Sequence, residues 1–186
     1  MNKLKHILSA AIAVVFTTTS FAQNYEIDVE QSILNWTGYA EVGGYSQSGT
    51  LNFSSGTMVL NEGELSGLNT RVDMRSLKHE EKDLETHLKQ KDFFYVKKYP
   101  EATLIFVGKE NEDFLFDLTI RGITQTIVLP VNIEMTKSGC TASGKVTIDR
   151  TRFDIKYNSA SYFQDLGSYA IKNEFDLEYI LVFKTK

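Results

Sequence analysis

The sequence has little cysteine and no block of positive charge. Its 186 residues include a single cysteine, Cys140, which excludes an internal disulfide framework and any zinc or iron–sulfur site built from several cysteines. The formal net charge is −4 without any run of lysine or arginine, so the chain lacks the electrostatic footprint of a nucleic-acid-binding protein. Aromatic residues make up 12% and charged residues 24%, which excludes a disordered or collagen-like chain. Cys140 falls at the start of a predicted strand, and we expect it to be a small packed thiol.

Catalytic signatures are also missing from the sequence. No GxSxG, GxGxxG or GxxxxGK[ST] motif occurs, so the chain has neither a nucleophile elbow nor a phosphate-binding loop of these types. The segment from His79 to Asp83 begins like the zincin HExxH motif, but Asp83 stands where a second histidine is required. His79, Asp83 and His87 are spaced to share one helix face and could bind Zn²⁺, although a solvated charged face has the same pattern. We predict no catalytic residue, cofactor or metal, with a lipid-acting enzyme that holds a metal on this helix as an alternative.

The N-terminal segment has the pattern of a secretory signal peptide. Lys3 and Lys5 precede an apolar run over 7–16, and the small residues Ser20 and Ala22 fit a cleavage site after Ala22. We expect a signal peptide over 1–22 and a single domain over 23–186, located in the periplasm or secreted. Loss of the two lysines changes the formal net charge from −4 to −6. No later segment approaches eighteen consecutive apolar residues, so we do not expect an integral membrane protein.

Alternating apolar and polar residues dominate the rest of the chain. Three runs are clearest, 114–120, 127–135 and 175–183, and each places apolar side chains on one face of a strand. Weaker strand patterns cover 25–30, 33–40, 48–54, 57–61, 64–74, 102–109, 139–149 and 152–163. Leucines at helical spacing between Ser76 and Lys91 predict one short helix over about 77–90, with Ser76 as its N-cap. Many short strands and one helix predict an all-β fold, an antiparallel barrel with the helix near an end.

Three separated motifs resemble the YceI-like family. They are Val72-Asp73-Met74 with His87–Phe94 and Lys98–Thr103, then Phe116–Thr124, and then Thr147–Phe153. The resemblance covers roughly residues 25–184, with the motifs in order. It implies an extended, antiparallel, eight-stranded, lipocalin-like barrel in the bacterial periplasm, and an interior that holds a long apolar molecule such as a polyisoprenoid.

From this resemblance we expect a periplasmic or secreted binding protein that holds an isoprenoid-type lipid for carriage or sequestration. The lipid would be a polyprenyl chain, a quinone or a fatty amide, and a dry tunnel holds such a chain without a catalytic group because each buried CH₂ contributes about 0.8 kcal/mol. Candidates for the tunnel wall are Trp36, Phe53, Phe106, Phe116, Leu118 and Phe153. Candidates for the entrance are Leu88, Phe93, Phe94 and Tyr99, with His87 and Arg121 as partners for a head group. The other alternative is a ligand-free, packed barrel that acts through a protein partner, and the sequence does not specify an oligomeric state.

Overall fold

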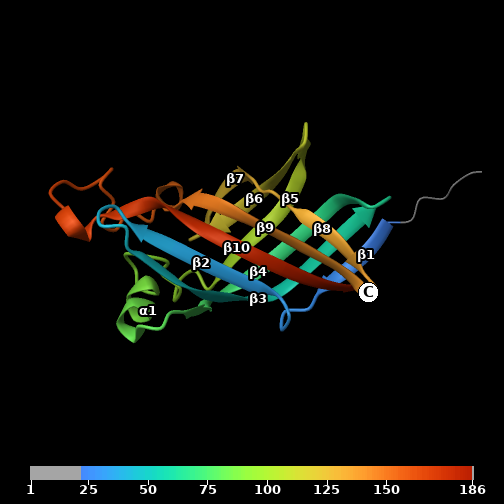
Figure 1. Cartoon of the computed structure of the whole chain (residues 1–186), viewed down its shortest axis with the longest axis horizontal. Coiled ribbons are helices and arrows are strands. Elements are labelled where there is room, and N and C mark those ends of the chain that lie inside the picture. Colours follow the sequence, from blue (N-terminus) through green and yellow to red (C-terminus); the bar gives the residue numbers. More distant parts are fainter. Residues whose placement is uncertain (1–21, 186) are drawn as a thin grey trace, which may run out of the picture.

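The structure is a computed structural model and describes residues 22–185, which form one antiparallel sheet of ten strands with one α-helix. The expected signal peptide lies outside the described residues except for Ala22, where the first strand begins. The strands are β1 (Ala22–Ile27), β2 (Ile33–Ala40), β3 (Ser46–Asn61), β4 (Glu64–Lys78), β5 (Glu101–Glu110), β6 (Asp113–Ile120), β7 (Ile123–Val128), β8 (Asn132–Thr136), β9 (Gly139–Asp149) and β10 (Ile171–Thr185). Figure 1 shows an elongated molecule, with the helix α1 (Lys82–Leu88) at one end and β1 with the C-terminus at the other.

The ten strands fill eight positions around the barrel. Both β1 and β2 pair with β3 on one side and β10 on the other, so they share one position. A second position is shared by β7, which pairs with β6, and β8, which pairs with β9. The predicted extended, eight-stranded, antiparallel barrel is therefore confirmed in class, with two of its strands each divided in two.

Each division has a local cause in the sequence. Between β1 and β2, the Asp28 carboxylate accepts hydrogen bonds from the backbone N–H groups of Glu30 and Gln31, which closes a turn. Between β7 and β8 lies Pro130, which has no N–H to donate to a neighbouring strand. The Tyr179 hydroxyl donates a hydrogen bond to the Pro130 carbonyl and ties β10 to this break.

The side chains that face inward are those that the alternation groups on one face of each strand, but they fill only part of the barrel interior. Toward the end that holds β1 and the C-terminus, the interior is packed with side chains that are 3% exposed or less: Tyr25, Met58, Leu60, Cys140, Ala142 and Phe183. Toward the end that holds α1, the interior contains a cavity. An eight-stranded barrel is wide enough for either arrangement, and this one has both.

Cys140 is fully buried and forms no disulfide, which confirms the expected packed thiol. Burial raises the pKa of its thiol to about 11. The thiolate is the reactive form of cysteine, so this side chain is inert at neutral pH in the folded protein.

Four predictions about local structure are wrong. The run 127–135 is not one strand but is divided between β7 and β8. The patterns at 48–54 and 57–61 are not two strands but parts of the continuous strand β3. The helix covers Lys82–Leu88 rather than about 77–90, because β4 continues to Lys78, and Ser76 is a strand residue whose hydroxyl accepts from the Asn52 N–H. The segment 152–163 is not a strand. Its first residues belong to the 3₁₀-helix η1 (Arg150–Phe153), and Asp154, which ends this helix, has a left-handed φ of 60°. Turns follow Asp154. A second 3₁₀-helix, η2 (Gly167–Tyr169), precedes β10. Within residues 22–185, no helix has the length and apolar character needed to cross a membrane.

Candidate ligand-binding site

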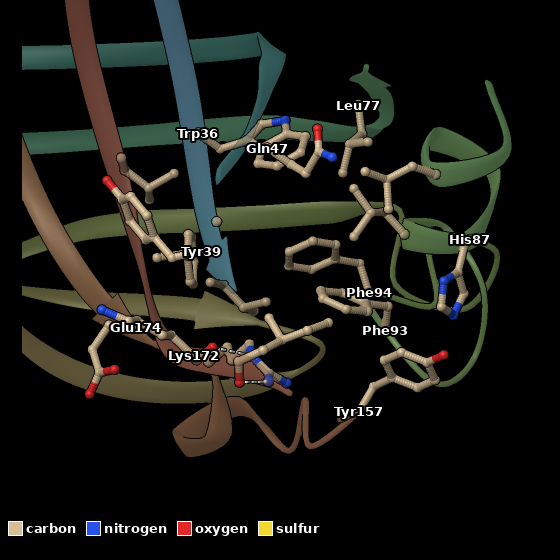
Figure 2. Close-up of a pocket in the computed structure, with 18 of the residues that line it drawn as sticks. Trp36, Tyr39, Gln47, Leu77, His87, Phe93, Phe94, Tyr157, Lys172 and Glu174 are labelled. Atoms are coloured by element: carbon tan, nitrogen blue, oxygen red, sulfur yellow. Dashed lines mark hydrogen bonds between the residues drawn. The ribbon is translucent and has the colours of Figure 1, made fainter. Parts of the chain in front are cut away.

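The main cavity has a volume of about 290 Å³ and occupies the α1 half of the barrel. Its walls come from β2, β3, β4, β5, β6 and β10, while α1 and the loop that follows it cover one side of the end (Figure 2). Apolar side chains make most of the lining: Leu34, Trp36, Leu51, Val72, Met74, Leu77, Leu84, Leu88, Phe93, Phe94, Ala102, Leu118, Ile120, Phe175 and Leu177. A space with this lining favours an apolar ligand.

A second cavity of about 70 Å³ adjoins the first, toward the middle of the barrel. The two cavities share four lining residues, Leu34, Val72, Leu118 and Leu177, so these side chains lie where the two cavities adjoin. Phe53, Leu104, Ile127 and Tyr179 are among the residues that enclose the inner space. A chain that reached from the main cavity into the inner one would therefore meet apolar walls in both.

Trp36 forms one wall of the main cavity because its strand partner is a glycine. The indole lies over Gly49, its direct neighbour across β2 and β3, and a Cβ at Gly49 would lie 1.9 Å from the Lys78 carbonyl oxygen and 2.8 Å from the indole nitrogen. The His79 ring also lies against the indole, with 5.8 Å between ring centroids. The Trp36 side chain is thus held in place, although its buried N–H has no hydrogen-bond partner within the described residues.

Aromatic side chains cover the cavity on the side where α1 lies. Phe93 and Phe94 project between β2 and α1 in Figure 2, with ring centroids 5.3 Å apart. His87 stands edge-on to Tyr157, with ring centroids 4.6 Å apart, and its Nε2 lies 3.0 Å from an Asp92 carboxylate oxygen. These contacts join the helix to the segment after η1.

Glu85 anchors α1 to the end of β4. Its carboxylate accepts hydrogen bonds from Lys89 and Lys82, at 3.0 and 3.1 Å, and from the His79 backbone N–H at 3.3 Å. The same three bonds, with that of Lys89 as the largest, lower the pKa of Glu85 to about 2. The helix is therefore held over the cavity partly by a carboxylate that must be ionised.

Exposed aromatic side chains surround the opening. Tyr45 on the β2–β3 hairpin and Tyr169 in η2 both line the cavity, yet they are 75% and 77% exposed. The hairpin and the loop before β10 meet where the Glu41 N–H donates to the Ala170 carbonyl at 2.8 Å. The rim of the cavity is therefore amphipathic, with apolar rings that carry polar hydroxyl groups.

The structure brings together about half of the residues that the sequence singles out. Those that line the main cavity are Trp36, His87, Leu88, Phe93, Phe94 and Leu118, and those that line the inner cavity are Phe53 and Leu118. Five others line neither cavity: Phe116 and Phe153 are buried in the core, Phe106 packs on Phe116, Tyr99 packs on Tyr95, and Arg121 donates to the Asp154 carbonyl. Ligand contact by any of these residues stays a prediction.

Several other residues that line the main cavity were not predicted from the sequence. Met74 and Leu77 lie on β4, and Phe175 and Leu177 share the inward face that the alternation in β10 had indicated. Arg150 belongs to the third family motif and lines the cavity with only 3% of its surface exposed. Nothing in its sequence context distinguishes it from the neighbouring Arg152.

The metal site considered on the predicted helix is not assembled. His79 precedes α1, so it does not share a helix face with Asp83 and His87. The Nδ1 of His79 accepts from the Glu81 N–H, its Nε2 lies 3.0 Å from the Gln47 side-chain oxygen, and His87 pairs with Asp92. No group of three or more metal-binding side chains is found in the part of the chain that the structure describes.

These features define an antiparallel β-barrel with an apolar internal cavity that opens at one end. The chain belongs to the YceI-like domain family, whose model matches residues 25–183. A UPF0312 protein of Photorhabdus laumondii is 28% identical over 182 residues, which cover 86% of this chain and 91% of that protein. A UPF0312 protein of Pseudomonas savastanoi is 27% identical over 142 residues, covering 69% of this chain and 71% of that one.

Two solved structures have the same fold. BcnA of Burkholderia cenocepacia matches with a TM-score of 0.69 at 19% identity, and the match covers 83% of this chain and 98% of BcnA. A polyisoprenoid-binding domain from Saccharophagus degradans matches with a TM-score of 0.67 at 12% identity, covering 87% of this chain and 98% of that domain. At these identities, the likeness establishes the barrel and not the ligand.

Proposed function

We propose that this protein holds a single isoprenoid-type chain in the barrel interior and carries or sequesters it in the periplasm. The observation that carries the proposal is the main cavity of about 290 Å³ with its apolar lining and open end. The description of the Saccharophagus degradans domain as polyisoprenoid-binding supports the choice of chain. The expected signal peptide supports the location.

The size of the cavity sets the amount of chain that it can enclose. An apolar cavity of about 150 Å³ binds one benzene molecule, so the main cavity accommodates roughly a dozen carbon atoms and the inner cavity roughly three more. At about 0.8 kcal/mol per buried carbon, the gain is on the order of 10 kcal/mol before the cost of ordering the chain is subtracted. That gain is sufficient for reversible capture without a catalytic step.

A larger side chain where the two cavities adjoin tests the proposal. Leu118 lines both cavities, and Leu118→Trp places a larger side chain where a long chain must pass. Farnesol, with fifteen carbons, should bind the wild-type protein and lose most of its affinity for this variant in equilibrium titrations. The matched control is Ile105→Trp, which adds the same ring at a side chain that is 45% exposed on β5. Equal farnesol binding by both variants, or no binding by the wild-type protein, would refute the proposal.

A further inference from the structure

Arg150 is a buried cation at the wall of the main cavity. It directly follows β9 and begins η1, and it is 3% exposed. Its guanidinium donates to three backbone carbonyls: Nε to Lys172 at 3.0 Å, Nη1 to Ile155 at 2.8 Å and Nη2 to Ile171 at 3.0 Å. Its Cζ also lies 5.8 Å from the centroid of the Phe93 ring.

None of these partners carries a negative charge. No carboxylate within residues 22–185 forms an ion pair with Arg150. Asp149 is adjacent in sequence, but its Oδ1 accepts the N–H and hydroxyl of Thr151, and Glu174 is exposed on β10. Burial lowers the pKa of Arg150, while the charges of Asp149 and Glu174 act in the opposite direction. A buried charge without an ionic partner is costly, and buried charges in proteins are usually paired.

The guanidinium also retains hydrogen-bonding capacity. Arginine has five N–H donors, and the three carbonyl bonds use one on Nε, one on Nη1 and one on Nη2. One N–H on each terminal nitrogen is therefore left without an acceptor in the described chain. Such donors match the two oxygens of a carboxylate or a phosphate.

The place of Arg150 along the barrel gives the ligand a direction. Arg150 lies near the open end of the main cavity, beside the first residues of β10, Ile171 and Lys172. Leu118 and Leu177 separate this part of the barrel from the inner cavity, whose lining is apolar apart from Thr70 and the hydroxyl of Tyr179. An anionic group at the opening and an apolar chain directed inward would satisfy both ends of the site.

We infer that the barrel selects single-chain amphiphiles with an anionic head, a carboxylate or a phosphate monoester, which pairs with Arg150 while the chain fills the cavities. This inference rests on the proposed function, because the chain must enter the same space. It replaces His87 and Arg121, the head-group partners expected from the sequence, with a residue that is buried and forms no ion pair with a carboxylate. A purely structural role for Arg150, as a link between η1 and β10, predicts no preference among head groups.

The test is a series of ligands with one chain and different heads. Dodecanoate, dodecyl phosphate, dodecanol and dodecylammonium are titrated into the wild-type protein below their aggregation concentrations, with farnesol and inorganic phosphate alone as further arms. The two anionic ligands should bind about 10- to 100-fold more tightly than dodecanol, as expected for hydrogen bonds to charged groups, and dodecylammonium should bind most weakly. Equal affinity for all heads would overturn the inference and leave the proposed function intact. Failure of every chain, farnesol included, would refute the proposed function itself.

Two variants test whether Arg150 is the cause of the preference for anionic head groups. In Arg150→Met, the affinity for the two anionic ligands should fall to about that for dodecanol, whereas Arg150→Lys should keep part of the preference because it retains the charge without the fork of donors. The control is Arg152→Met, which removes the same charge from an exposed position in the same 3₁₀-helix and should leave the preference unchanged. If Arg150→Met does not fold, Arg150→Lys and the wild-type series decide. Loss of the preference in Arg152→Met, or binding of inorganic phosphate as tight as that of dodecyl phosphate, would contradict the inference.

Discussion

Filling part of the main cavity should shorten the chain that the protein accepts. Ala102 lies on β5, is 7% exposed and lines the cavity beside Val72, its paired neighbour on the adjacent strand β4. Ala102→Leu adds three carbon atoms to the wall, and these displace about three carbons of a ligand that fills the space. At about 0.8 kcal/mol per carbon, the loss is about 2.4 kcal/mol, or about 50-fold in affinity.

The loss should depend on the length of the ligand. Farnesol has fifteen carbons and should suffer the full effect, whereas geraniol has ten and should lose about fivefold or less because it leaves part of the cavity empty. The same substitution buries apolar carbons in a void, so the free energy of unfolding should rise by about 0.5–2 kcal/mol. Isothermal titration with the two prenols and thermal unfolding of the free protein measure these effects.

The control is Thr103→Leu, at the next residue of β5, because successive strand residues point to opposite faces. This variant should bind both prenols as the wild-type protein does. If Ala102→Leu weakened geraniol and farnesol equally, or weakened neither, the reasoning from cavity volume would be refuted.

Three further predictions concern the framework of the site. The pKa of Glu85 is lowered from an ordinary 4.5 to about 2, so its ionised carboxylate stabilises the folded protein above pH 4.5, and this stabilisation is lost as the pH falls toward 2. Glu85→Gln should therefore flatten the acid dependence of the free energy of unfolding in denaturant titrations. Gly49→Ala should lower the free energy of unfolding by about 1–3 kcal/mol and shift the Trp36 fluorescence, because the added Cβ would overlap the Lys78 carbonyl and the indole ring. An unchanged fluorescence spectrum would contradict the packing described. Cys140 should resist a thiol reagent at pH 8 and react fully in denaturant, and rapid labelling of the native protein would show that the barrel opens there.

The sequence predicts the sheet well because alternation is a local property. Apolar residues two apart, such as Phe116, Leu118 and Ile120, must share a face of a strand, and all three are buried. The helix boundaries were less accurate because good helix formers continue upstream of Lys82, where pairing of β3 with β4 decides the conformation instead. The segment after Asp149 alternates in sequence but turns because the Asp149 side chain caps η1.

The site could be predicted only in part. Leu88, Phe93 and Phe94 were found because a family motif contains them, but the boundary between the packed and hollow halves of the barrel depends on which residues face each other across the interior. Phe116 and Leu118 lie on the same face of β6, yet Phe116 is in the core and Leu118 lines both cavities. Arg150 and Arg152 are equivalent in the sequence, and only the fold buries one and exposes the other.

The most direct test of the central claim is to identify what the barrel contains in the cell. The protein is purified from its native cells without detergent, extracted with organic solvent and analysed by mass spectrometry, and the extract is compared with that of Leu118→Trp. The account predicts an apolar single-chain lipid in near-stoichiometric amount, strongly reduced in the variant. A wild-type protein that yields no lipid and takes up no added prenol would contradict the account.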